Sequence, residues 1–180
     1  MSTMEVIKTM SEIKDLVDNI DTFVPQGAPK NNYFRSDLSG LLVVSLAATY
    51  ENCVKDIIIE HAENYHPAFG RYAEKQYERL NSRVNLNDLY GYAKKLGQHL
   101  KLQFNQELLK AERRITRNPA MDDNGTPRYN KFQIVKEYHR LLDSRHAFAH
   151  ARQTSITIQE AYRMHRYARF VILAFSRALA

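Results

Sequence analysis

The sequence predicts an all-α fold, a bundle of helices, and two observations support this prediction. The chain of 180 residues contains only six glycines and five prolines, fewer than the many turns of a sandwich or barrel require. Apolar residues recur at three- and four-residue intervals along most of the chain, which is the spacing of one helix face. The length fits one domain, 1–180, built around a single core.

The helical periodicity places the elements along the chain. We expect helices at residues 3–21, 36–62, 70–80, 85–97, 106–116, 130–151 and 157–179. A break around His66, Pro67 and Gly70 separates the second helix from the third. A capping box formed by Thr157 and Glu160 starts the last helix.

Two further patterns describe how these helices are joined and packed. Prolines and glycines predict loops at 24–32 and 117–130. The second helix is apolar almost all round from Leu38 to Ala48, which predicts a buried central helix.

Cysteine content and hydropathy point to a cytoplasmic protein without a membrane span. Cys53 is the only cysteine, which excludes an internal disulfide and a cysteine-based zinc site and suits a reducing compartment. The N-terminal residues lack the apolar core of a secretion signal. The longest apolar run, Leu41 to Ala48, is much shorter than the roughly 20 residues that cross a bilayer.

Positive charge is concentrated in the C-terminal part of the chain. Residues 126–180 contain ten lysines and arginines against three acidic residues, whereas residues 1–125 contain 16 basic and 17 acidic residues. Eight of the ten C-terminal cations are arginines, whose planar donor fork suits phosphate. This pattern is typical of a solvated helix face or of a face that binds a polyanion such as RNA or DNA.

The stretch "SRHAFAHAR" near the end of the 130–151 helix gathers the candidate site residues Arg145, His146, His150 and Arg152. Cations at a helix C-terminus also interact with the helix dipole, so each residue alone has a structural explanation. His146 and His150 are four residues apart and share a face, whereas Arg145 lies about 140° around the helix from His150. The long Arg145 side chain could curl round, the helix could end early, or a second subunit could bring its own copy into reach. Ala147, Ala149 and Ala151 would allow that close approach, which favours a symmetric dimer.

Two other functions are weaker interpretations of this stretch. His146 and His150 have the i, i+4 spacing of metal ligands, but "HAFAH" lacks the glutamate after the first histidine that such hydrolases use as a base, and no third ligand is evident. A helix-turn-helix that binds DNA is disfavoured because the turn after Ala151 leads into an apolar core helix.

The spacing Arg145-x4-His150 resembles the R-x(4–6)-H motif of the HEPN superfamily. "RSDLSGLLVVSLAATYENCVKDIIIEHA" is similar to the family's second core helix, and "ERLNSRVNLNDLYGYAKKLG" resembles the inserted segment of the RiboL-PSP-HEPN or MAE-type branch. The resemblance covers residues 35–175. It implies an up-and-down core of four to five helices, an inserted helical segment at about 64–118 and a loop at 118–130.

The resemblance also implies an activity, that of a metal-independent endoribonuclease without a cofactor, whose site is shared across a homodimer. His150 would act as general acid or base, and Arg145 would hold the scissile phosphate. The RNA 2′-hydroxyl would attack and leave a 2′,3′-cyclic phosphate. Glu51 and His146 would support these two residues, with a buried ion pair and a helix-end hydrogen bond as the structural alternatives.

Further expectations concern partners. Arg152 and Arg140 would contact RNA phosphates. Some HEPN toxins carry a tyrosine, modified by a partner enzyme, two residues after the motif histidine, but Arg152 stands there in this chain. A role in prokaryotic anti-phage defence or in a toxin–antitoxin pair would place the antitoxin, sensor or ATPase on a separate chain. The alternative is a non-catalytic HEPN-like scaffold that binds RNA or a partner protein.

Overall fold

Seven α-helices form the regular structure of the part of the chain that the computed structural model describes, residues 3–27, 31–78, 84–117, 133–151 and 155–180. They are α1 (Thr3–Phe23), α2 (Asn31–Tyr65), α3 (Pro67–Tyr77), α4 (Leu86–Leu96), α5 (Gln98–Arg117), α6 (Gln133–Ala151) and α7 (Ile158–Leu179). No strand occurs in these residues, which confirms the all-α helical bundle.

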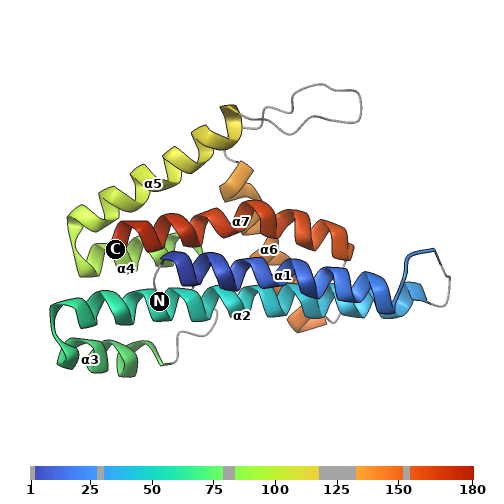
Figure 1. The fold of residues 1–180 in the computed structure, drawn as a ribbon, viewed down its shortest axis with the longest axis horizontal. Helices are drawn as coiled ribbons and strands as arrows, with labels where there is room; N and C mark the ends of the chain where they lie inside the picture. Colours follow the sequence, from blue (N-terminus) through green and yellow to red (C-terminus); the bar gives the residue numbers. More distant parts are fainter. Residues whose placement is uncertain (1–2, 28–30, 79–83, 118–132, 152–154) are drawn as a thin grey trace.

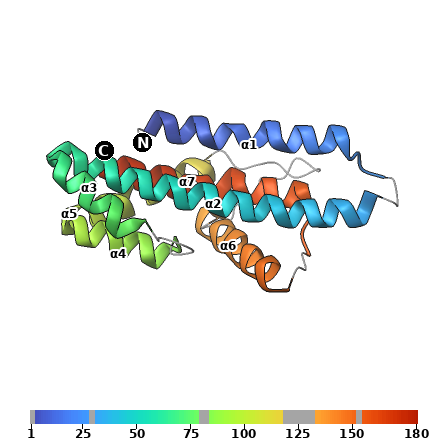
Figure 2. The ribbon, with the colours of Figure 1, turned by 90° about the horizontal axis from the view of Figure 1, so that it is seen from below.

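The long helices α1, α2 and α7 lie side by side, with α2 and α7 running in one direction and α1 in the other (Figure 1). The view from below shows α6 crossing beside α2 at a steep angle (Figure 2). α3 folds back along the C-terminal end of α2, and α4 and α5 pack on α7. None of the helices in the described residues is long and apolar enough to cross a membrane.

The helices α3 to α5 fall within the segment 64–118 that we interpret as an insertion. They pack at the side of the molecule where α2 and α7 end, which is the side that carries the C-terminus in Figure 1. The loop expected at 118–130 is outside the described residues. The division into one domain with an inserted segment stays a prediction.

Three helix starts were predicted wrongly. α3 begins at Pro67 and not at residue 70, so Pro67 and Gly70 belong to the helix and only His66 marks the break. α2 begins at Asn31 and not at residue 36, so it includes the last two residues of the predicted loop at 24–32. α5 begins at Gln98 and not at residue 106. Its first turn follows Gly97 directly, because the Leu100 amide donates to the Gly97 carbonyl over 3.0 Å without any polar side chain acting as a cap. The sequence therefore carries no visible start signal for α5.

Capping residues were predicted more reliably. The predicted capping box of Thr157 with Glu160 is present, and Asn85 with Asp88 forms a second capping box at the start of α4. The predicted break is at His66, whose imidazole accepts a hydrogen bond from the Ala68 amide over 3.1 Å and caps α3.

The prediction that α2 is buried all round is only partly right. Leu42 and Leu46 are fully enclosed, but Leu41 is 55% exposed and Ala48 is exposed as well. The reason is that α1, α3, α6 and α7 cover the other sides of α2 and leave this stripe open. An apolar stripe on the surface is a candidate contact with another molecule.

A buried polar chain ties α1, α2 and α7 together at His165, which is 1% exposed. Its Nε2 is 3.0 Å from the Met10 carbonyl oxygen, so this nitrogen carries the proton and donates. Nδ1 then accepts from the Tyr50 hydroxyl over 2.9 Å. Burial lowers the pKa of His165 to about 4, and nearby Arg169 acts in the same direction. The ring is therefore neutral in the folded protein at neutral pH.

We expect this histidine to make the fold sensitive to mild acid. The unfolded chain takes up a proton near pH 6.5, but the folded chain does so only near pH 4. The free energy of unfolding should therefore fall as the pH drops through this window, by about 3 kcal/mol in all. Urea denaturation at several pH values measures the loss. The variant His165→Gln should flatten the curve in this window, and equal slopes for variant and wild type would contradict the assignment.

Candidate active site

α6 carries the clustered arginine and histidines, and its N-terminal end is held by a carboxylate from α5. Glu112 Oε1 accepts hydrogen bonds from the backbone amides of Ile134 (2.9 Å) and Val135 (3.3 Å), which would otherwise be orphaned at a helix start. Burial raises the pKa of Glu112, and the amide donors oppose that rise. The contact bridges 22 residues of sequence, and no local pattern in the sequence predicts it.

The C-terminal part of α6 rests on α2 through a glycine. A methyl group at Gly40 would stand 2.1 Å from Cε2 of Phe148, so only glycine permits this approach. Phe148 lies between the two motif positions, Arg145 and His150. The alanines expected to allow a close approach, Ala147 and Ala149, are exposed and are not used in this contact within the chain.

Arg145 faces α2. Its Nη2 is 3.8 Å from Oε1 of Glu51, and the two side chains are 27% and 19% exposed. Partial burial weakens solvent screening, so the carboxylate constrains the guanidinium more than a surface ion pair would. The pairing of these two residues is present in the structure, whereas the role of Glu51 in a reaction stays a prediction.

His146 and His150 lie on the exposed part of α6, with their ring centroids 4.3 Å apart. Both imidazoles are open to solvent and to an incoming molecule. Arg145 is turned toward α2, as the angular separation around the helix predicts, and the contacts of the described residues include none between it and His150. The structure therefore brings together Arg145 with Glu51 and His146 with His150, as two pairs on different sides of one helix end.

Of the two arginines predicted to contact RNA phosphates, one lies in the described residues and the other does not. Arg140 Nη1 is 3.0 Å from Oε2 of Glu137. The other oxygen of this carboxylate, Oε1, accepts a hydrogen bond from the side-chain amide of Gln133 over 2.6 Å. Part of the Arg140 charge is thus neutralised within α6, although its side chain is 39% exposed. Arg152 lies outside the described residues.

One residue of this surface was not singled out in the sequence. His139 is exposed and lies on the same stripe of α6 as Asp143, His146 and His150, at successive spacings of four, three and four residues. The helical periodicity of charged and histidine positions would have found it. In the described residues no group of three or more histidine, cysteine, aspartate or glutamate side chains is arranged to hold a metal ion.

Comparison with known proteins gave one match. The family model described as RiboL-PSP-HEPN matches residues 4–180, nearly the whole chain. No curated protein and no solved structure matched the sequence.

Proposed function

Because the chain belongs to the RiboL-PSP-HEPN family, we propose that it is a metal-independent endoribonuclease whose site is built on Arg145 and His150. The observation that carries the proposal is the contrast between these two residues at one helix end. Arg145 is half-buried and held by Glu51, whereas His150 is exposed beside His146. A fixed cation and an accessible imidazole are the two groups that phosphodiester transesterification needs.

In this proposal each residue has a distinct task. The His150 imidazole removes the proton of the RNA 2′-hydroxyl or protonates the leaving 5′-oxygen, since imidazole exchanges protons near neutral pH. Arg145 holds the scissile phosphate by its donor fork and stabilises the charge that builds on its oxygens. The 2′-oxygen loses its proton and bonds to phosphorus, the bond to the 5′-oxygen breaks, and this oxygen takes up a proton, so that a 2′,3′-cyclic phosphate and a 5′-hydroxyl remain. The second proton transfer would fall to the His150 imidazole of the other copy or to water.

A homodimer would complete this site. Arg145 and His150 point to different sides of α6, and a second copy related by two-fold symmetry would bring an arginine and a histidine onto one phosphate. An apolar contact surface is available close by. Leu41, 55% exposed, follows Gly40, on which Phe148 packs, and Phe34, also on α2, is 56% exposed. This stripe of α2 supports pairing of two copies beside the ends of their α6 helices.

The biological setting follows from the same proposal. An endoribonuclease of this kind would act in the cytoplasm, in prokaryotic anti-phage defence or as the toxin of a toxin–antitoxin pair. A separate antitoxin, sensor or ATPase chain would control it. The competing function is a non-catalytic scaffold that binds RNA or a partner protein, in which the pair of Arg145 and Glu51 only ties α6 to α2.

The experiment that tests the proposal is cleavage of RNA and of DNA of the same sequence by the purified protein in EDTA. We expect the RNA to be cut and the DNA to stay intact, because DNA lacks the 2′-hydroxyl. Loss of RNA cleavage in EDTA, restored by a divalent metal, would contradict the proposed chemistry. Binding of RNA without any cleavage would favour the scaffold.

A further inference from the structure

A second basic surface lies between α5 and α7, away from the motif on α6. A groove of about 560 Å³ opens there, and we call it the α5–α7 groove. It is lined by Glu107, Lys110, Ala111, Arg113, Arg114, Phe170 and Arg177. Four of these seven residues are cations and one is an acid, so the described part of the lining carries a net charge of three positive units.

Most of this charge has no acidic partner. Lys110 Nζ is 2.6 Å from Oε1 of Glu107, so the acidic residue named in this lining is already paired with a lysine. Arg113, Arg114 and Arg177 are exposed and form no ion pair with another residue in the described parts of the chain. Three unpaired guanidinium groups around one groove create a positive potential that attracts anions.

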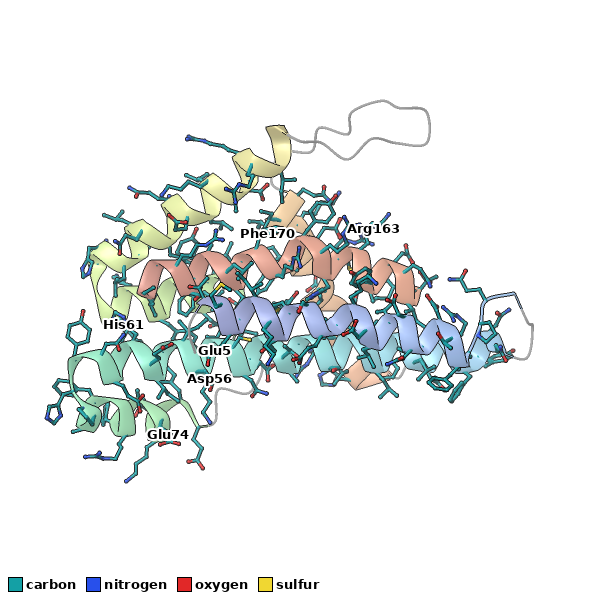
Figure 3. The ribbon with its side chains drawn as sticks, in the orientation of Figure 1. Glu5, Asp56, His61, Glu74, Arg163 and Phe170 are labelled. Atoms are coloured by element: carbon teal, nitrogen blue, oxygen red, sulfur yellow. The ribbon has the colours of Figure 1, made fainter. Side chains whose placement is uncertain are left out.

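The charge continues along α7 beyond the groove. Arg163, Arg166, Phe170 and Arg177 follow one another at spacings of three, four and seven residues, so they lie along one stripe of the helix. Figure 3 shows Arg163 and Phe170 on the same edge of α7. The stripe from Arg163 to Arg177 spans 14 residues of helix, about 21 Å. This length exceeds a single phosphate and fits several units of a linear polyanion.

Phe170 adds an apolar element to the cationic stripe. It is half-buried and lines the groove, and the Arg169 guanidinium carbon lies 5.3 Å from the centre of its ring. Aromatic rings beside arginines are the means by which proteins hold the bases and backbone of single-stranded nucleic acids.

The shape of the groove also argues against a small ligand. Its cations are exposed at the rim and do not enclose an anion, so they offer little shielding from water to one phosphate. They are better suited to summed contacts with a repeating backbone, whose bound counterions are released on binding.

We propose that the α5–α7 groove and the arginine stripe of α7 bind the backbone of single-stranded RNA, as a substrate-holding surface separate from the site on α6. This inference rests on the proposed endoribonuclease function for its choice of RNA. The cations of this surface come from α5 as well as from α7. The excess positive charge of residues 126–180 therefore accounts only for the α7 wall of the groove.

The test is the affinity for a short labelled RNA whose 2′-oxygens are methylated, so that it cannot be cut. The variant Arg113→Gln/Arg177→Gln removes one cation from each wall. We expect about a tenfold loss of affinity and a decrease of about 1.4 in the slope of log K against log salt, since each lost phosphate contact in a single strand contributes about 0.7. The control Arg71→Gln/Lys75→Gln removes the same charge from exposed positions on α3 and should change the affinity less than twofold.

Several outcomes would overturn the inference: equal losses for groove and control variants, no RNA binding by the wild type, or equally tight binding of polyglutamate, which would indicate an acidic protein partner. Failure of the proposed nuclease can be distinguished from failure of the proposed binding surface. If the groove variants lose affinity but the wild type cuts no RNA, the binding surface is supported and the nuclease function is contradicted. If the wild type cuts RNA and the groove variants bind and cut RNA as well as the wild type does, the nuclease function is supported and the binding surface is contradicted.

Discussion

Replacing His150 with alanine is expected to reduce RNA cleavage by at least about 100-fold while leaving the fold unchanged. The rate should fall because general acid–base catalysis by one positioned side chain contributes about 10²- to 10⁴-fold. The fold should be retained because His150 is exposed near the end of α6 and its described contact is with another exposed ring, that of His146. Initial cleavage rates under saturating RNA, together with thermal melting, measure the two effects.

His139→Ala is the matched control for this experiment. His139 is an exposed histidine on the same stripe of α6, but it lies three helical turns before His150. We expect this variant to cut RNA at close to the wild-type rate. Equal activity of wild type and His150→Ala would remove His150 from the chemistry. Equal losses in both variants would show that the stripe binds RNA without singling out the motif histidine.

The second large effect is expected at Arg145. Arg145→Ala should lower the cleavage rate by about 10²- to 10³-fold, the range measured when one donor to a developing oxyanion is removed. Arg145→Lys should recover only a small part of the loss, because an ammonium group lacks the planar fork that binds two phosphate oxygens. Both variants should stay folded with only a modest fall in melting temperature, because the pair with Glu51 keeps some exposure and contributes on the order of 1 kcal/mol.

Glu51→Gln separates positioning from charge at the same pair. This variant keeps the shape of the side chain and removes the carboxylate that lies 3.8 Å from Arg145. If Glu51 orients the guanidinium, the KM for RNA should change little and kcat should fall. Unchanged kcat in Glu51→Gln would mean that this carboxylate only joins α6 to α2. Full recovery of activity in Arg145→Lys would mean that the positive charge alone, without the planar fork, is enough.

Local sequence patterns were enough to predict the class of the fold and several of its boundaries. The capping box at Thr157 and the helical periodicity of residues 133–151 depend on neighbours in sequence, and both are present in the structure. The start of α5 was missed because Gly97 ends α4 and also opens the next helix without a polar cap. The open stripe at Leu41 was missed because apolar periodicity alone does not show which side of a helix lacks a neighbour.

The site could be predicted only as a list of residues. The spacing of Arg145 and His150 around one helix indicated that they point apart, and the structure agrees. The pairing of Arg145 with Glu51 depends on how α6 meets α2, and that distance is set by Phe148 packing on Gly40. Contacts between residues far apart in the chain leave no local signal in a single sequence. The basic α5–α7 groove was hidden for the same reason, since its two walls lie far apart in the chain.

The most direct test of the central claim is cleavage of an RNA in which the nucleotide before the cut carries a single 2′-deoxy substitution. If the 2′-hydroxyl is the nucleophile, cutting in EDTA should stop at that position alone, while the unmodified RNA yields ends with a 2′,3′-cyclic phosphate. Continued cleavage at the substituted position would contradict the account, because the attacking oxygen would then come from water and the roles given to Arg145 and His150 would have to be abandoned.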